Sequence, residues 1–130
     1  MERHEVGGTH YEQMATQPIE LISRLRCDFT QGCIIKYICR YKNKNGAEDL
    51  KKSIDYAELA VQHGESEYRP DDIINVYENS KCIEEFFVDN KLTALQMAVI
   101  NSVLLHNYRV IIPILECILA IEYPKDRELK

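Results

Sequence analysis

Residues 28–46 have the sequence DFTQGCIIKYICRYKNKNG, which predicts one helix with a marked beginning and end. Asp28 or Thr30 can cap the first turn, because a short polar side chain accepts hydrogen bonds from the free N–H groups there. Asn45-Gly46 provides a stop signal. The apolar residues between these signals recur at the spacing of one helical face, namely Ile34, Ile38 and Tyr41.

The flanking sequence predicts a helix on each side of this stretch. Upstream, Pro18 suits an early helical position, and the apolar face would consist of Ile19, Ile22 and Leu25. Downstream, a helix should run from Ala47 to about His63. Its buried row would consist of Leu50, Ile54, Ala57 and Val61.

The C-terminal region, residues 70–123, predicts three more helices. Asp71 and Asp72 suit the start of one that reaches about Val88. Residues 92–106 and 110–121 are apolar nearly all round, and Pro113 makes the last helix start late or bend. Polar residues interrupt this region well before the roughly 18 apolar residues of a membrane span. We expect both helices to be covered, either within the fold or in a homo-oligomer interface.

The pattern as a whole predicts an all-α fold. No segment alternates like a strand over more than four residues, and no internal repeat is present. A length of 130 residues with 45% hydrophobic content suits one domain. We predict a compact bundle of five or six helices over residues 1–130. Residues 10–64 would form the ligand-binding half, and residues 70–123 would complete the core or form an oligomer interface.

Cysteine usage and the N-terminal sequence predict a cytoplasmic protein. Five cysteines, an odd number without a C-x-x-C pair, indicate reduced thiols. The first residues, MERHE, lack the apolar run of a secretory signal. The cysteines and the scattered histidines do not have zinc-ligand spacing, so no structural zinc site is predicted.

Basic charge is concentrated in one segment. Six basic residues and a single acidic residue lie between Arg24 and Lys44, whereas the whole chain has a net charge of −5. An acidic remainder would repel duplex DNA, but a local basic site could hold a small phosphorylated ligand. A solvated helix face is the alternative explanation. On the predicted helix, Lys36 and Arg40 lie one turn apart and face the same point.

The segment from His10 to Tyr56 resembles a known family. The residues that carry the resemblance are His10-Tyr11, Pro18-Ile19-Glu20, Phe29, Gly32, Ile35-Lys36-Tyr37, Arg40-Tyr41, Lys44-Asn45-Gly46, Asp49-Leu50, Lys52 and Tyr56. In order and spacing they resemble a domain family of formally unknown function that is common in tailed-phage genomes. One member is a phage nucleoside monophosphate kinase without a phosphate loop. The resemblance implies a phage or prophage origin and a link to nucleotides. Cys33 stands where the family commonly has asparagine, and Ser53 where it commonly has alanine.

The shared residues have the chemistry of a phosphate site. Lysine offers a point charge and arginine a bidentate fork, so several on neighbouring helices can converge on one phosphate. His10 could donate to a phosphate oxygen or relay a proton, and a tyrosine could stack on a base. The catalytic candidates are His10, Lys36 and Arg40. The nucleotide-binding candidates are Tyr11, Lys36, Tyr37, Arg40, Lys44, Lys52 and Tyr56.

Structural roles compete with each of these assignments. The tyrosines could pack against the core, and His10 could be a hydrogen-bonding residue at a helix entrance. Lys36 and Arg40 could pair with Asp49, Asp55 or Glu20. We expect Asp49 to orient Arg40, and metal binding by Asp49 is the less favoured alternative. No metal ligand or cofactor is predicted, with magnesium left open, because Asp49 and Asp55 lie about 240° apart around one helix.

Two functions from different classes fit the sequence, together with a weaker third. The first is a phosphoryl-transfer enzyme similar to a nucleoside monophosphate kinase, in which cations neutralise the transferred group. The second is a non-catalytic binder that sequesters a signalling nucleotide, linear or cyclic, to counter host defence. The third is an interaction protein whose basic helix docks an acidic partner. The first two require a small-molecule site and no contact with duplex nucleic acid or membrane.

Overall fold

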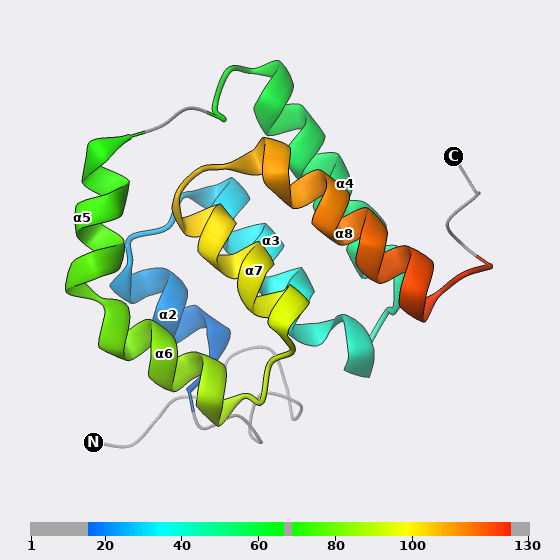
Figure 1. Ribbon diagram of the computed structural model, residues 1–130, viewed down its shortest axis with the longest axis horizontal. Helices are drawn as coiled ribbons and strands as arrows, with labels where there is room; N and C mark the ends of the chain where they lie inside the picture. Colours follow the sequence, from blue (N-terminus) through cyan, green and yellow to red (C-terminus); the bar gives the residue numbers. More distant parts are fainter. Residues whose placement is uncertain (1–15, 67–68, 126–130) are drawn as a thin grey trace.

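The computed structural model describes residues 16–66 and 69–125, and within these ranges every regular element is a helix. The elements are α2 (Pro18–Arg24), α3 (Phe29–Arg40), the 3-10 turn η1 (Tyr41–Asn43), α4 (Ala47–Gln62), α5 (Pro70–Glu78), α6 (Ser80–Asp89), α7 (Ala94–Leu104) and α8 (Tyr108–Glu122) (Figure 1). The prediction of an all-α bundle is confirmed. The described ranges contain seven α-helices, one more than the sequence suggested.

Helix α3 lies at the centre of the bundle, side by side with α7 (Figure 1). Two glutamine side chains join these antiparallel helices near their ends. Gln31 donates from Nε2 to the carbonyl of Val103 over 3.0 Å, and Gln96 donates from Nε2 to the carbonyl of Ile38 over 2.9 Å. Both bonds are buried, so their geometry specifies how the two helices align.

The beginning of α3 follows from its local sequence. Asp28 is the N-cap, and its carboxylate accepts from the backbone N–H of Gln31 over 2.8 Å. The side chain of Gln31 accepts from the backbone N–H of Asp28 in return, also over 2.8 Å. This reciprocal capping box confirms Asp28 as the residue that starts the helix.

The end of α3 and the start of α4 meet in a tight connection at Gly46. Its φ of +55° lies in the region that favours glycine. A Cβ atom there would lie 3.2 Å from Cε1 of Tyr123, so a side chain would fit only if the Tyr123 ring shifted. The predicted stop at Asn45-Gly46 thus separates two helices, after the short turn η1 has followed Arg40.

The apolar C-terminal helices are covered within one chain. Helix α8 packs against α4 and α7, and α7 also packs against α3. Helix α8 begins at Tyr108 and continues through Pro113, so the predicted late start does not occur. The fully buried side chains of the two helices are Val99, Ile100, Val103, Tyr108, Ile111, Leu115 and Ile118. This cover removes the need for a partner subunit on these faces.

The single helix predicted from Asp71 to Val88 is two helices, α5 and α6. They are separated at Asn79, whose side chain donates to the backbone carbonyl of Asn75 over 2.9 Å. Asparagine side chains compete in this way with the helical hydrogen-bond ladder. Asn75 in turn donates to the carbonyl of Leu25 over 3.0 Å, which joins α5 to the residue following α2.

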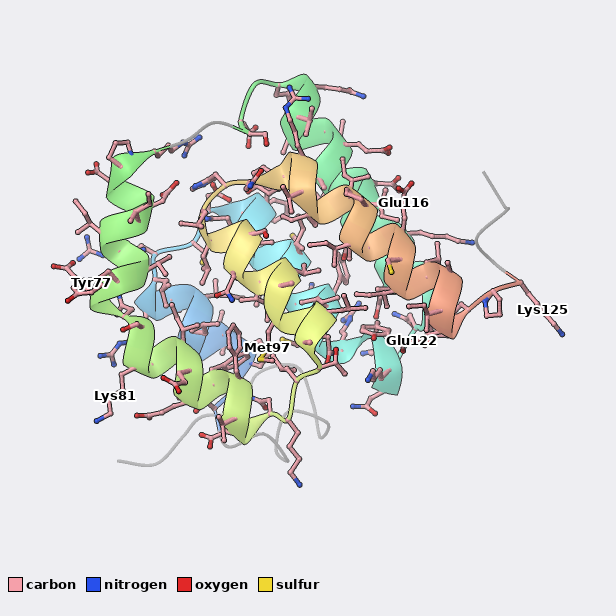
Figure 2. The ribbon with its side chains drawn as sticks, in the orientation of Figure 1. Tyr77, Lys81, Met97, Glu116, Glu122 and Lys125 are labelled. Carbon is pink, nitrogen blue, oxygen red and sulfur yellow. The ribbon has the colours of Figure 1, made fainter. Side chains whose placement is uncertain are left out.

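The apolar faces of α2 and α4 differ in part from those predicted. Leu21 in α2 and Leu25 just after it are buried, whereas Ile19 is 41% exposed. Helix α5 has no buried residue, and Tyr77 points away from the bundle (Figure 2). In α4, the predicted Leu50, Ile54 and Ala57 are buried, while Val61 is only partly so.

Two further predictions concern the chain as a whole. All five cysteines are free thiols in the structure. Among the described residues, no helix combines the length and the apolar character required to cross a membrane.

Candidate functional site

A cavity of about 610 Å³ opens between α2 and α3. One wall is apolar and comes from α2 and the first turns of α3, where Pro18, Ile19, Ile22, Phe29 and Gly32 line it. The other wall is basic and consists of Lys36, Arg40 and Lys44. A cavity with an apolar wall and a cationic wall suits a small amphipathic anion.

The basic wall follows from the periodicity of α3. Lys36 and Arg40 are half-buried and one helical turn apart, and η1 then carries the chain to the exposed Lys44. Three of the four predicted phosphate-binding cations therefore lie on one wall of the cavity. The fourth, Lys52, is on α4 outside the lining, and its Nζ lies 3.6 Å from the carboxylate of Glu48.

The ring of Tyr37 lies among three of these cations. Nζ of Lys36 is 5.1 Å from the ring centroid, Cζ of Arg40 is 5.0 Å away and Nζ of Lys52 is 5.8 Å away. Aromatic faces attract cations at such distances. The ring of Tyr37 thus attracts three positive charges toward one place. Two of these cations, Lys36 and Arg40, line the cavity.

The predicted aromatic residues stack on each other. The rings of Tyr37 and Tyr56 are 6.2 Å apart with an interplanar angle of 27°, and Phe29 meets Tyr56 edge-on at 6.1 Å. Neither tyrosine lines the cavity, whereas Phe29 does and is 75% exposed. Phe29 is thus the aromatic residue that a ligand in the cavity would contact.

Asp49 holds Arg40 in place. Nε and Nη2 of Arg40 lie 3.2 and 3.3 Å from the two carboxylate oxygens, and Asn45 donates to the same carboxylate over 3.2 Å. The carboxylate has no solvent exposure. The orienting contact that we predicted for Asp49 is present, although its importance for a ligand stays a prediction.

Cys33 lines the cavity. Its thiol interacts with the hydroxyl of Tyr56, and this hydrogen bond is the main cause that raises the pKa of Tyr56. The pair connects the cavity lining to the aromatic cluster.

Sequence reasoning missed part of the lining. Asp28 was identified only as a helix cap, and Ile19 and Ile22 were assigned to the core, yet all three line the cavity. The available signal was the spacing of Ile19 and Leu21. Side chains two positions apart lie about 200° apart around a helix, so these two side chains cannot both face the same core.

Two of the predicted site residues, His10 and Tyr11, lie outside the described residues. Within residues 16–66 and 69–125, no group of three histidine, cysteine, aspartate or glutamate side chains has metal-binding geometry.

A second cavity of about 570 Å³ lies on the other side of Lys44. It is lined by three lysines, Lys42, Lys44 and Lys51, together with the Gly46 connection, Glu48 and Tyr123. Lys44 therefore borders both cavities.

Residues 7–58 match the model of an uncharacterised domain family, described as a protein of unknown function (DUF3310). The matched segment contains every residue that lines the first cavity. No curated protein and no solved structure matches the chain.

Proposed function

We propose that the chain binds a nucleotide, or another phosphorylated small molecule, in the first cavity. The observation that carries this proposal is the pairing of the basic wall with the apolar wall of the same cavity. The phosphate would lie against Lys36, Arg40 and Lys44, and the base against Phe29 and Ile22. The small volume of the cavity and the net charge of −5 argue for a small anion and against duplex nucleic acid.

The activity that we favour is phosphoryl transfer of the nucleoside monophosphate kinase type. Such a reaction moves the terminal phosphoryl group of a nucleoside triphosphate to a monophosphate and yields two diphosphates, so it needs two adjoining nucleotide sites. We infer that the donor would bind in the second cavity, which adjoins the first at Lys44. Lys44, between the cavities, would offset charge on the transferred group.

The alternative is a non-catalytic binder that sequesters a signalling nucleotide to counter host defence. Cys33 favours it, because a thiol in the cavity lining replaces the amide that the resembling family commonly has there. Such a binder needs the first cavity alone. The weaker third reading, docking of an acidic partner on the basic helix, needs neither cavity.

The resemblance to a tailed-phage family supports a phage or prophage origin and a place in the host cytoplasm. A homo-oligomer stays a prediction, although α7 and α8 no longer require one. Light scattering after size exclusion should give a mass above the 15.2 kDa of one chain. A monodisperse monomer would contradict this prediction.

The test of binding is calorimetric titration with a panel of nucleoside monophosphates, triphosphates and cyclic nucleotides. Lys36→Ala and Lys44→Ala should each weaken binding about ten-fold, because a charge-assisted contact to phosphate is lost. Lys81→Ala is the control and should bind like wild type, because this exposed lysine on α6 lines neither cavity and points away from the bundle (Figure 2). Equal binding by all four proteins, or none by any, would contradict the proposal.

Chromatography of the same mixtures separates the two functions. Conversion of a monophosphate and a triphosphate into diphosphates, reduced in Lys42→Ala and Lys51→Ala, would support the enzyme. Tight binding without conversion, unaffected by these two substitutions, would support the binder.

A further inference from the structure

His106 is a buried histidine in the connection between α7 and α8. It is 6% exposed, and its φ of +55° is rare for a residue other than glycine. Such a conformation persists only where the surrounding contacts hold it.

Both ring nitrogens of His106 face carboxylate oxygens. Nδ1 lies 2.7 Å from Oδ2 of Asp72, and Nε2 lies 3.0 Å from Oδ2 of Asp28. Asp28 caps α3, and Asp72 lies in the first turn of α5. One side chain thus joins three segments that are distant in the sequence, including the helix that carries the basic wall.

The proton count of the ring decides which of these bonds can form. A neutral imidazole has one N–H donor, whereas donation to both carboxylates needs two, so both bonds can form only with the imidazolium. Nη1 of Arg69 lies 3.3 Å from Nε2. When the ring is neutral, with its proton on Nδ1, Nε2 can accept from Arg69 and no longer donates to Asp28.

The net charge around the ring depends on its proton. Two carboxylates, one guanidinium and the imidazolium sum to zero, whereas loss of the proton leaves a net negative charge. Tyr108, from α8, meets the ring edge-on at 6.0 Å. Burial is the main cause that raises the pKa of the Tyr108 hydroxyl. Asp28, Glu65 and Cys27 raise this pKa further, and Arg69 lowers it. Tyr108 therefore stays uncharged.

We propose that His106 is a proton-operated clamp that fixes the start of α3 when it is charged and releases Asp28 when it is neutral. Histidine changes charge in the physiological pH range, which makes it suited to this role. Since Asp28 lines the first cavity, the clamp would make ligand binding depend on pH. Only this last consequence rests on the proposed function. The clamp itself can be tested without a ligand.

The direct test is an NMR titration of the imidazole nitrogens in the wild-type protein. At pH 6 the Nδ1 and Nε2 shifts of His106 should both be those of protonated nitrogens, and Nε2 should change on raising the pH to 8. The exposed His63 provides the reference titration in the same sample. A His106 ring that is neutral at pH 6 would overturn the clamp.

Unfolding measured against pH gives a second test. The folding equilibrium constant of wild type should fall about ten-fold between pH 6 and pH 8, as expected for loss of a hydrogen bond between charged groups. In Asp28→Asn this fall should be smaller, because asparagine caps a helix as well as aspartate but carries no charge. His63→Gln is the control and should follow wild type. Identical pH profiles for wild type and Asp28→Asn would also overturn the clamp.

Ligand titration at pH 6 and pH 8 then tests the regulation. Wild type should bind more tightly at pH 6, and Asp28→Asn should lose this difference. A ligand bound with the same pH dependence by both proteins would refute the regulation while the proposed function stands. If no nucleotide binds at all, the proposed function and the regulation fall together, and the two ligand-free tests still decide the clamp.

Discussion

Arg40 and Asp49 form a bidentate ion pair across the turn between α3 and α4, with an Arg40 side chain that is 14% exposed and an Asp49 side chain that is fully buried. Arg40→Ala would leave a buried carboxylate without its charge partner. We expect a loss of about 3 kcal/mol in the free energy of unfolding, near the low end for a broken buried pair because Arg40 retains some exposure. Urea denaturation of wild type and Arg40→Ala measures this loss in the free energy of unfolding. Arg40→Ala is therefore a poor probe of ligand binding, for which Lys36→Ala is better suited.

The double variant Arg40→Ala/Asp49→Ala is the control for this prediction. Removing both charges should recover part of the loss, because no unpaired carboxylate is left. Strictly additive effects of the two single substitutions would show that the ion pair is not coupled.

Gly46→Ala should destabilise the connection between α3 and α4. The positive φ of Gly46 strains any side chain by about 1–3 kcal/mol, and the added Cβ would also press on the ring of Tyr123. Gly64→Ala is a matched control, since its φ is +72° but no atom lies within 4 Å of the added Cβ. Thermal unfolding should show the larger loss at Gly46. A larger loss at Gly64 would contradict the contact with Tyr123.

Gln96→Leu should weaken the attachment of α7 to α3. The substitution removes a buried hydrogen bond to the carbonyl of Ile38 and the capping contact with Thr93. We expect a loss of about 1–3 kcal/mol in the free energy of unfolding. Gln62→Leu, on the exposed end of α4, should change it by no more than about 0.5 kcal/mol. Equal effects at both positions would show that the buried bond contributes nothing.

Because its thiols are buried, the protein should have a lower free energy of unfolding at alkaline pH. Burial raises the pKa of Cys39 from 9.0 to about 12, so the unfolded chain loses its proton first. The contribution of this thiol is complete below pH 9 and declines by about 1.4 kcal/mol per pH unit between pH 9 and 12. Cys39→Ala should flatten the decline, whereas Cys117→Ala, at an exposed position, should not. If the free energy of unfolding fell equally steeply with pH in wild type and in Cys39→Ala, the raised pKa of Cys39 would be contradicted.

Local signals in the sequence predicted α3 and α4 well. The Asp28 cap, the row of Ile34 and Ile38 and the Gly46 stop all act within a few residues of one another. The division between α5 and α6 was missed, because it depends on the side chain of Asn79 and on docking against Leu25.

The candidate site was predictable to a similar extent. The spacing of Lys36 and Arg40 on one helix, with Lys44 close behind in the sequence, allowed the basic wall to be identified in advance. The apolar wall depends on how α2 packs. The contact between Asp28 and His106 joins residues 78 positions apart, and no pattern within one segment predicts it.

The antiparallel pairing of α3 with α7 also bears on synthesis of the chain. The residues that α7 joins to α3 are translated 58 to 72 positions after their partners. At about 5–20 residues per second, α3 leaves the ribosome roughly 3 to 14 seconds before α7 does. During that interval α3, whose Ile34, Ile35 and Ile38 are buried in the finished fold, lacks one of the helices that it packs against. The nascent chain therefore presents an aliphatic stripe to chaperones until its C-terminal helices have been made.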